Sequence, residues 1–404
     1  MREPSTNSST STLIASMEAL RHALFLARAQ LGARPLRSLT LTLGLAVALA
    51  LPSLSALGVS RLGARLSARA EGVPVLVVPR GEAVDGTLAA LYFRPGPPLG
   101  LRFGQIGELR EAAGEPSLRA APLHLGHSAD GAPIVGTGLA YFEERGLEVA
   151  VGRRPALLGE VVVGAALASA RGLGPGDRVR SDLRDLYDLS GASPLSLPVV
   201  GVLAPTGNAD DYAVFTDVKT CWALDGHLHG HAAAAAPLAE GAAPDEGAAA
   251  TFLIQALDEE TRGNFHLHGD EAELLISSVM WFPQSDRARD LLLAAVEAQP
   301  GVEAVRPARL VGSLLGVLRQ VEVGVRLGLM AVSAAALAFF AVALQLARAA
   351  RAEERRLLVR LGASRRRLLL FGLVEDGIVV MGAVLVAALL VGLGLFALDR
   401  ALLG

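Results

Sequence analysis

The chain has 404 residues, of which 52% are hydrophobic and 4% aromatic, and its formal net charge is −3. A hydrophobic fraction this high argues against an ordinary soluble enzyme and directs attention to membrane-spanning segments. The only cysteine, Cys221, excludes an intrachain disulfide, so any folded domain must be held together by its own hydrophobic core.

Residues 1–12 are rich in serine and threonine, which predicts disorder. Residues 13–31 repeat apolar side chains at helical spacing, which predicts a helix lying in a membrane interface. We therefore expect residues 1–37 to form an arm that contains this amphipathic helix. Its apolar stripe consists of Leu13, Met17, Leu20, Leu24 and Leu31.

Three segments contain no charged residue: 38–60, 327–347 and 377–398. Each has the length of about 20 apolar residues that a helix needs to cross a bilayer. They predict transmembrane helices at 38–60, 321–347 and 371–398. A secretory signal is the alternative for the first segment, but that segment follows a long arm and exceeds the usual apolar length of a signal. A retained anchor is expected.

The distribution of charge orients these spans. Residues 1–37 carry five arginines and two acidic residues, and residues 348–367 carry eight arginines and two glutamates. The segment 61–326 has 23 basic and 33 acidic residues, a balance of −10. Because positive loops stay on the cytoplasmic side, the arm and the arginine-rich loop are expected inside and the long segment outside. Topology thereby accounts for the arginines, and no nucleic-acid partner is expected.

Residues 61–320 mix patterns of strands and helices, so the expected fold class is an α+β membrane protein in which transmembrane helices flank a large mixed α/β domain. Residues 232–250 are a low-complexity Ala/Gly/Pro stretch, predicted as a flexible loop in an insertion at 227–250. Strands are predicted at 148–151, 160–163, 197–203, 212–216 and 302–306, the third and fourth paired with each other, and helices at 165–172, 285–299 and from Leu310 onward.

The loop between the second and third spans reads E-R-R-L-L-V-R-L-G-A-S-R-R-R. It resembles the loop of the FtsX-like permease family, the membrane subunits of MacB-type ABC systems. Glu354, Glu375 and the L-G-A-S string at 361–364 stand at matching positions. Arg355 replaces the usual isoleucine, and Arg360 is shifted by one position. Further strings that resemble the family's first-span border and periplasmic core domain lie at 34–37, 159–168, 172–179 and 199–203.

The resemblance implies a non-enzymatic permease of the bacterial inner membrane, whose large domain (61–320) is periplasmic. Such permeases form homo- or heterodimers on two ATPase subunits, and ATP-driven closure moves the exported domains to export or extract an envelope substrate. A periplasmic adaptor or lipoprotein and membrane lipids are further expected partners. The family has four spans, whereas three are predicted here, so the fourth is expected either to be truncated or to come from elsewhere.

Residues 348–370 would be the cytoplasmic coupling loop of such a permease, with Gly362 as its turn. A loop that is merely solvated and positive is the alternative. Glu375 and Asp376 would face polar partners or simply mark the membrane edge. The residues assigned to ATPase coupling are Glu354, Leu357, Leu358, Leu361, Gly362, Ala363 and Ser364.

No catalytic residue is assigned. A Walker-type ATP site requires G-x-x-x-x-G-K-[ST], and the single lysine, Lys219, stands in D-V-K-T-C without those glycines. ATP hydrolysis is therefore expected in a separate subunit. Asp210 and Asp211 predict a turn rather than a pair of catalytic acids.

Five of the eight histidines form H-x-H patterns at 227–231 and 266–268. Alternate positions of a strand lie on one face, which suits a borderline cation such as zinc. Solvated loop residues are the alternative, and a catalytic zinc lacks the H-E-x-x-H spacing. His124 and His127 are expected at the surface. The candidate metal ligands are His227, His229, His231, His266 and His268.

Besides a permease, the sequence permits a membrane-anchored periplasmic binding or regulatory module that senses a metal or controls an envelope enzyme. A membrane metallohydrolase rests on the histidines alone.

Overall fold

The computed structural model of the protein describes residues 21–22, 24–29, 32–33, 35–94, 100–183, 194–230, 255–256, 265–267 and 269–403. The chain divides into two compact units. The helical unit comprises the residues up to Gly63 together with Gly316–Leu402, and the sheet domain comprises Ala64–Leu315, with which the last two residues are grouped. The predicted disordered start and the low-complexity stretch at 232–250 lie outside the described residues.

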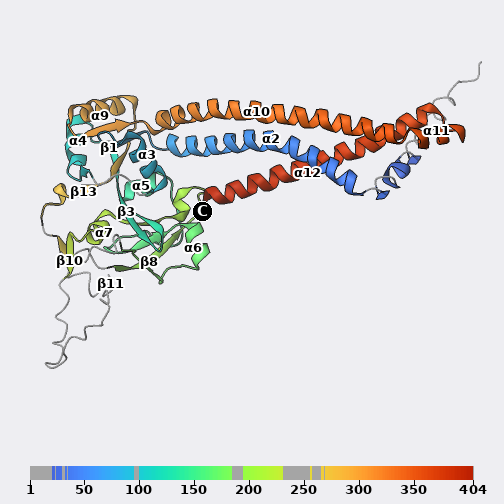
Figure 1. Ribbon diagram of the computed structural model, residues 1–404. Coiled ribbons are helices and arrows are strands. Elements are labelled where there is room, and N and C mark those ends of the chain that lie inside the picture. The colour runs from blue at the N-terminus through green and yellow to red at the C-terminus, as the bar shows by residue number, and fades with distance from the viewer. Residues whose placement is uncertain are drawn as a thin grey trace, which may run out of the picture. The chain divides into compact units, whose positions relative to one another are not determined.

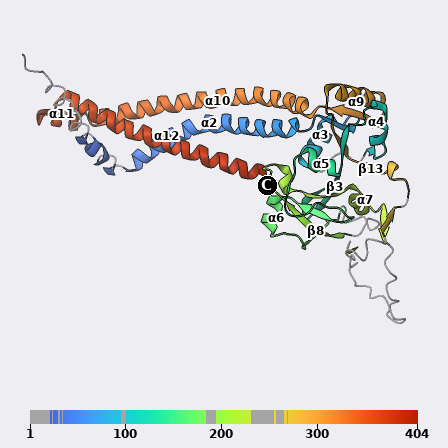
Figure 2. The same cartoon turned by 180° about the vertical axis from the view of Figure 1, so that it is seen from behind.

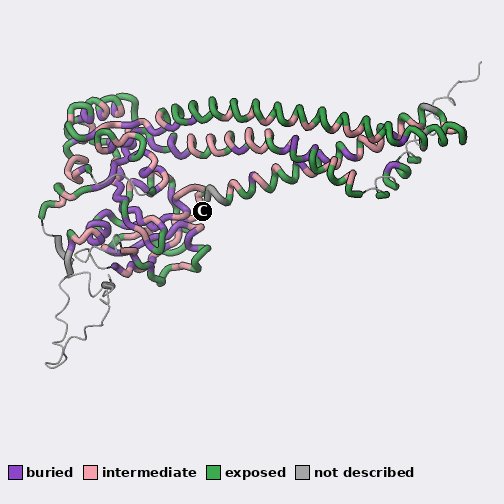
Figure 3. The backbone as a smooth tube through the Cα atoms, in the orientation of Figure 1, coloured by how far each residue is buried: buried purple, intermediate pink, exposed green. Residues whose placement is uncertain are grey.

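The helical unit contains most of the long helices α2 (Pro35–Glu71), α10 (Pro307–Ala350) and α12 (Arg365–Leu403), and the short helix α11 (Ala352–Arg360) (Figure 1). By length and composition, α2, α10 and α12 could each cross a membrane, the only such helices among the described residues. Figure 3 shows that α10 and α12 are exposed along much of their length. Exposed apolar surface on this scale calls for an apolar surrounding or a partner.

Within the helical unit, small and polar residues bring the helices together. Gly394 of α12 leaves room for Leu54 of α2, because a Cβ on the glycine would lie 2.8 Å from that side chain. Ser333 of α10 donates a hydrogen bond from Oγ to the carbonyl oxygen of Ala48 in α2 at 2.6 Å. Close packing at small residues and interhelical hydrogen bonds are typical of membrane helices.

The sheet domain combines short helices with many strands (Figure 2). Its helices are α3 (Ala83–Tyr92), α4 (Gln105–Ala113), α5 (Leu139–Glu144), α6 (Ala165–Arg171), α7 (Val218–Leu224) and α9 (Asp286–Ala298). Its strands are β1 (Val75–Pro79), β2 (Leu101–Arg102), β3 (Arg119–Ala129), β4 (Ala132–Thr137), β5 (Val149–Gly152), β6 (Val161–Val163), β7 (Arg178–Arg180), β8 (Leu195–Leu203), β9 (Val214–Asp217), β10 (Leu228–Gly230), β11 (Gln255–Ala256), β12 (Phe265–Leu267), β13 (Leu275–Ile276), β14 (Ser278–Phe282) and β15 (Val302–Val305).

The main sheet has the order β11-β8-β6-β9-β4-β3-β14-β1-β15, and β5 and β7 also pair with β8. It is mixed, since β4 and β9 are parallel whereas β3 and β4 are antiparallel. The predicted strands exist, but the predicted pairing of 197–203 with 212–216 is wrong because β6 lies between β8 and β9. The run Val161–Val163 is apolar on both faces, as a strand in the middle of a covered sheet requires.

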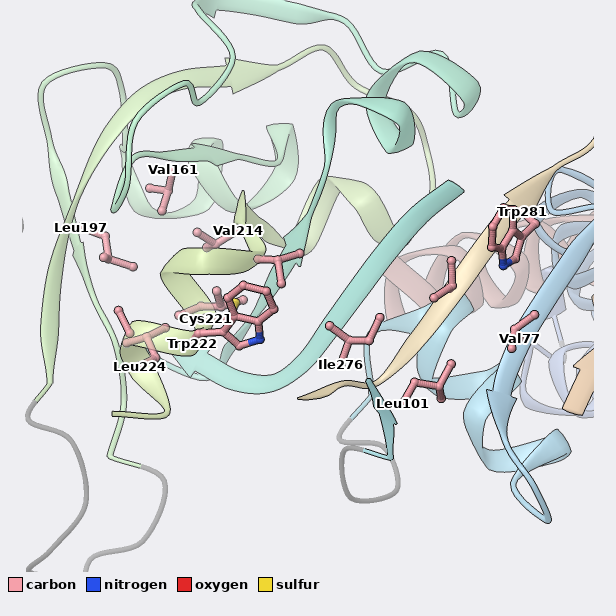
Figure 4. Packing of buried hydrophobic residues seen from close by; sticks show 14 of the residues in the cluster. Val77, Leu101, Val161, Leu197, Val214, Cys221, Trp222, Leu224, Ile276 and Trp281 are labelled. Atoms are coloured by element: carbon pink, nitrogen blue, oxygen red, sulfur yellow. The ribbon is translucent and has the colours of Figure 1, made fainter. Parts of the chain in front are cut away.

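Apolar layers cover both faces of this sheet. Val75 and Val77 belong to one buried cluster, and Leu76 and Val78 belong to the other. Because alternate side chains of a strand point to opposite faces, each cluster is one face of the sheet. The first face packs against α4, α6, α7 and α9, and Figure 4 shows Trp222 in this layer. The second packs against α3, α5, the end of α2 and the start of α10.

A buried ion pair lies at the end of α2 within the sheet domain. Arg69 donates from Nη1 and Nη2 to the two carboxylate oxygens of Asp210 at 2.9 and 3.1 Å, and the two side chains are 4% and 1% exposed. Arg69 also donates to Asn208 Oδ1 at 2.7 Å and to the carbonyl of Leu91. The hydroxyl of Tyr141 donates to Asp210 at 2.7 Å. Burial raises the pKa of Asp210, but the charge of Arg69 and these hydrogen bonds outweigh it and lower the pKa below its ordinary value.

Glu160 closes the loop that precedes β6. Its carboxylate accepts hydrogen bonds from Arg153 Nη1 and Nη2 at 2.7 and 2.6 Å, and from the N–H groups of Ala156 and Leu157 at 3.0 and 3.1 Å. The bonds from Arg153, against the effect of burial, lower the pKa of Glu160 to about 2. The loop is therefore built around the charged form of this residue.

Replacement of Asp210 by alanine is expected to destabilise the sheet domain by about 3–5 kcal/mol, because Arg69 would remain buried without its counter-charge. Urea unfolding of the full chain in detergent, followed through the fluorescence of the two buried tryptophans of this domain, measures the change. The matched control is Glu271→Ala, whose exposed pair with Lys219 contributes about 1 kcal/mol or less. Equal losses in the two variants would contradict the role given to the buried pair.

Replacement of Glu160 by glutamine is expected to lower the free energy of unfolding by about 2 kcal/mol at neutral pH. The folded pKa of about 2 lies below the ordinary value of 4.5, so this stabilisation is complete above the ordinary value and is lost as the pH falls toward the folded one. The difference between wild type and variant should therefore shrink on acidification, in the same urea experiment. A difference that stays constant down to pH 3 would show that the carboxylate charge is not its source.

Candidate functional site

The loop between α10 and α12 contains a short helix and a tight turn. Helix α11 ends at Arg360, and Gly362 adopts a left-handed conformation with φ of +96°. The N–H groups of Gly362 and Ala363 donate to the carbonyl oxygens of Val359 and Leu358, both at 3.0 Å. This pair of hydrogen bonds forms a Schellman motif, in which glycine is favoured because it has no Cβ.

Ser364 starts the next helix immediately after this turn. It directly precedes α12, and the N–H of Arg367 donates to its Oγ at 3.4 Å and to its carbonyl oxygen at 3.0 Å. A serine in this place satisfies an N–H group that the first turn of a helix leaves without a partner. The L-G-A-S string is thus a helix stop followed at once by a helix start.

An apolar group protrudes from this helix and turn. Leu361 is 83% exposed, and Leu357 and Leu358 are exposed beside it. Exposed arginines, among them Arg360, surround the group. Ala363 is half-buried, whereas Glu354 lies in α11 with its side chain outside the described residues. Exposed leucines amid cations form a surface that can receive an acidic partner with an apolar pocket.

Glu375 and Asp376 hold the two ends of the loop together. Arg351, directly after α10, donates from Nη1 and Nη2 to the two carboxylate oxygens of Glu375, each at 3.0 Å. Arg348, in the last turn of α10, pairs with Asp376. The first pair is bidentate and mostly buried, a geometry that restricts orientation as well as distance. The acidic residues therefore tie α12 to the end of α10.

The two H-x-H patterns lie only in part within the described residues. The antiparallel register of β10 and β12 pairs His229 with His266. His227 precedes β10 and is exposed. His231 and His268 lie outside the described residues, as do the side chains of His229 and His266. The zinc site suggested for this segment stays a prediction.

A different histidine cluster lies inside the sheet domain. His124 Nε2 is 2.7 Å from Asp225 Oδ2, and His127 Nε2 is 3.0 Å from Asp225 Oδ1. The imidazole rings stack with centroids 5.6 Å apart and planes inclined by 8°. The prediction of surface positions is wrong, because His124 and His127 are 1% and 8% exposed. Burial raises the pKa of Asp225, but the histidine contacts outweigh it and lower the pKa below its ordinary value.

A β-bulge brings the two imidazoles to one side of the sheet. Residues three apart on a regular strand face opposite sides. Between His124 and His127, however, the register of β3 with β4 shifts, and Gly126 has φ of +136°. Buried Ser277 supports the bulge, accepting a hydrogen bond at Oγ from the N–H of Leu125 at 2.8 Å. Such a bulge re-aims side chains, which strand periodicity alone does not predict.

Helix α7 places Asp225 in this cluster because the helix packs closely against Gly136. Gly136 lies opposite His124 in the β3–β4 register. A Cβ on Gly136 would lie 2.5 Å from Cys221 Sγ and 3.1 Å from the Cβ of His124. Asp225 caps the C-terminus of α7 one turn beyond Cys221. Burial raises the pKa of the Cys221 thiol, so this cysteine acts as an apolar packing residue.

No family profile matches the chain, and no curated protein matches its sequence. Among solved structures, a similarity is found to the extracellular domain of the noncanonic ABC-type transporter YknZ from Gram-positive bacteria. The identity is 12% and the TM-score 0.31, over 58% of this chain and 98% of that chain. A TM-score of this size does not establish a shared fold.

Replacement of Gly136 by alanine is expected to destabilise the sheet domain by about 1–3 kcal/mol, because the new methyl group would overlap Cys221 Sγ. Cys221→Ala removes that sulfur, so the double variant should recover part of the loss. A double-mutant cycle measured by urea unfolding gives the coupling. Strictly additive losses would show that α7 does not pack on Gly136 in this way.

Proposed function

We propose that the chain is a membrane permease subunit of an ABC transport or mechanotransmission complex. The observation that carries the proposal is the coupling loop: a short helix with protruding leucines, a glycine turn and a capped helix start, placed between two helices of membrane-spanning length. The resemblance of the same residues to the FtsX-like loop adds support. The sheet domain would lie on the periplasmic side of the bacterial inner membrane.

The ion pairs at the base of the loop suit the transmission of force. A helix that receives a push moves its neighbours only if its ends cannot swing freely. Arg351 and Glu375 join α10 to α12 through two parallel hydrogen bonds, and Arg348 with Asp376 adds a second connection. In the proposed complex, a displacement of α11 would therefore shift α10 and α12 together.

The exposed leucines and arginines of α11 and the turn after it suit contact with a cytoplasmic ATPase subunit. Leu357, Leu358 and Leu361 would enter an apolar pocket of a cytoplasmic ATPase subunit, and the surrounding arginines would meet acidic residues at its rim. ATP hydrolysis would occur in that subunit. A second permease subunit, identical or different, would cover apolar surface of the helices, membrane lipids would cover the rest, and an adaptor or lipoprotein could join outside.

Leu361→Asp and Gly362→Pro are expected to abolish co-purification of the ATPase with the tagged full chain from native membranes. The aspartate would place a charge in the apolar contact, and proline cannot adopt the positive φ of residue 362. The measurement is the ATPase activity and the stoichiometry of the eluate.

Two controls sharpen this experiment. Leu139→Asp changes an exposed leucine of the sheet domain and should leave the association intact. Gly362→Asn should retain more association than proline, because asparagine tolerates the left-handed region. The proposal is wrong if no Walker-type ATPase accompanies the wild-type chain, or if both coupling-loop variants retain it at wild-type yield.

A second candidate function is a membrane-anchored binding or regulatory module without transport. The buried histidine–aspartate cluster favours it, because a group of possible metal ligands in the sheet domain suits binding or sensing. A chain that folds, remains in the membrane and never associates with an ATPase would support this alternative.

A further inference from the structure

The buried cluster of His124, His127 and Asp225 is not used by the proposed function. We propose that these three residues form a binding site for a divalent transition-metal ion, with zinc as the best fit. The site lies between strand β3 and the end of helix α7. It is distinct from the H-x-H patterns at 227–231 and 266–268.

The donor atoms suit zinc in type and in position. Two imidazole nitrogens and a carboxylate form a ligand set that zinc accepts, and three protein ligands leave a fourth position for water or another small ligand. The donor atoms of the three residues all lie within 4.8 Å of one another. Tetrahedral zinc with bonds of about 2.1 Å holds its ligands roughly 3.4 Å apart. Since Asp225 is already 2.7 and 3.0 Å from the two nitrogens, small side-chain adjustments suffice.

The backbone holds the three side chains close together without a bound ion. The bulge in β3 aligns the two imidazoles, and their planes differ by only 8°. Gly136 admits α7 close enough for Asp225 to reach both rings. Metal sites supported by a strand and a helix end are better preorganised than sites on long loops.

Burial strengthens the case for a cation. The Asp225 carboxylate lies among side chains that are almost entirely buried, and one nitrogen of each imidazole is within hydrogen-bond distance of it. A divalent ion in their midst would replace the two bridging protons and interact directly with the buried carboxylate. A purely hydrogen-bonded His–Asp–His group is the competing interpretation, and it predicts no metal affinity.

The test uses the full chain in detergent, stripped with a chelator and then dialysed against zinc chloride. The variant that retains the cluster replaces His229, His231, His266 and His268 by glutamine, and should bind one equivalent of zinc. Adding His124→Gln and His127→Gln to this background should abolish that equivalent. The apparent dissociation constant should rise by more than the roughly 10–100-fold typical of changes outside the ligand shell. Mass spectrometry and competition with a zinc indicator give stoichiometry and affinity.

Cobalt provides a test that does not depend on loss of function. In the same background, His127→Cys should still bind Co²⁺ and should add a thiolate-to-cobalt charge-transfer band in the near ultraviolet, because cysteine is itself a good ligand. His227→Cys is the control and should not produce the band.

The proposal is overturned if the variant without the four loop histidines binds no zinc, or if the cluster variants bind as tightly as their background. It is also overturned if Co²⁺ gives the charge-transfer band with His227→Cys but not with His127→Cys. None of these results bears on ATPase association, so the metal site and the permease function fail or stand separately.

Discussion

The buried ion pair of Arg69 with Asp210 holds the last turn of α2 in place within the sheet domain. Two charges almost without solvent contact are tolerated because Nε, Nη1 and Nη2 of Arg69 each donate to a partner, and the carboxylate of Asp210 also accepts from Tyr141. The pair fixes the last turn of α2 against the second apolar layer. The first turns of α10, through Val311 and Leu315, pack in that same layer.

This arrangement matters for the proposed mechanism. Both helices that leave the sheet domain have their ends in one apolar cluster, beside strands that form the middle of the main sheet. Closely packed interiors transmit small displacements instead of absorbing them. Within the sheet domain, a displacement of the last turn of α2 or of the first turns of α10 would therefore reach the strands that share this apolar layer.

Local chemistry in the sequence predicted local structure well. A helix was predicted at 285–299, and the structure confirms it as α9, with Ser285 Oγ accepting a hydrogen bond from the N–H of Ala288. Gly362 was predicted as a turn, and its positive φ confirms that conformation, while its role in coupling stays a prediction. The helix-capping role of Ser364 agrees with the preference for serine at this position, but it was not predicted from the sequence. In each case the residues that decide the structure lie within four positions of one another.

Features that depend on distant residues could not be predicted in this way. Strands β8 and β9 were identified, but nothing local indicates that β6 separates them. Asp225 lies 101 and 98 residues from the two histidines that it contacts. On a regular strand, two histidines three residues apart would face opposite sides of the sheet, so their proximity cannot be predicted without the bulge. The H-x-H patterns led to the prediction of a metal site because their histidines are close together in the sequence. The cluster of His124, His127 and Asp225 forms only when the chain folds.

The arginines at the start of α12 show how a cost in local stability can indicate function. Residues 365–367 occupy the first turn, where the partial positive charge of the helix N-terminus disfavours cations by about 0.3–1 kcal/mol each at exposed positions. No carboxylate is paired with Arg366 or Arg367 among the described residues. Helix stability alone would favour acidic residues there. We propose that a partner outside the helix, either anionic lipid headgroups or the acidic rim of the proposed ATPase, stabilises these arginines.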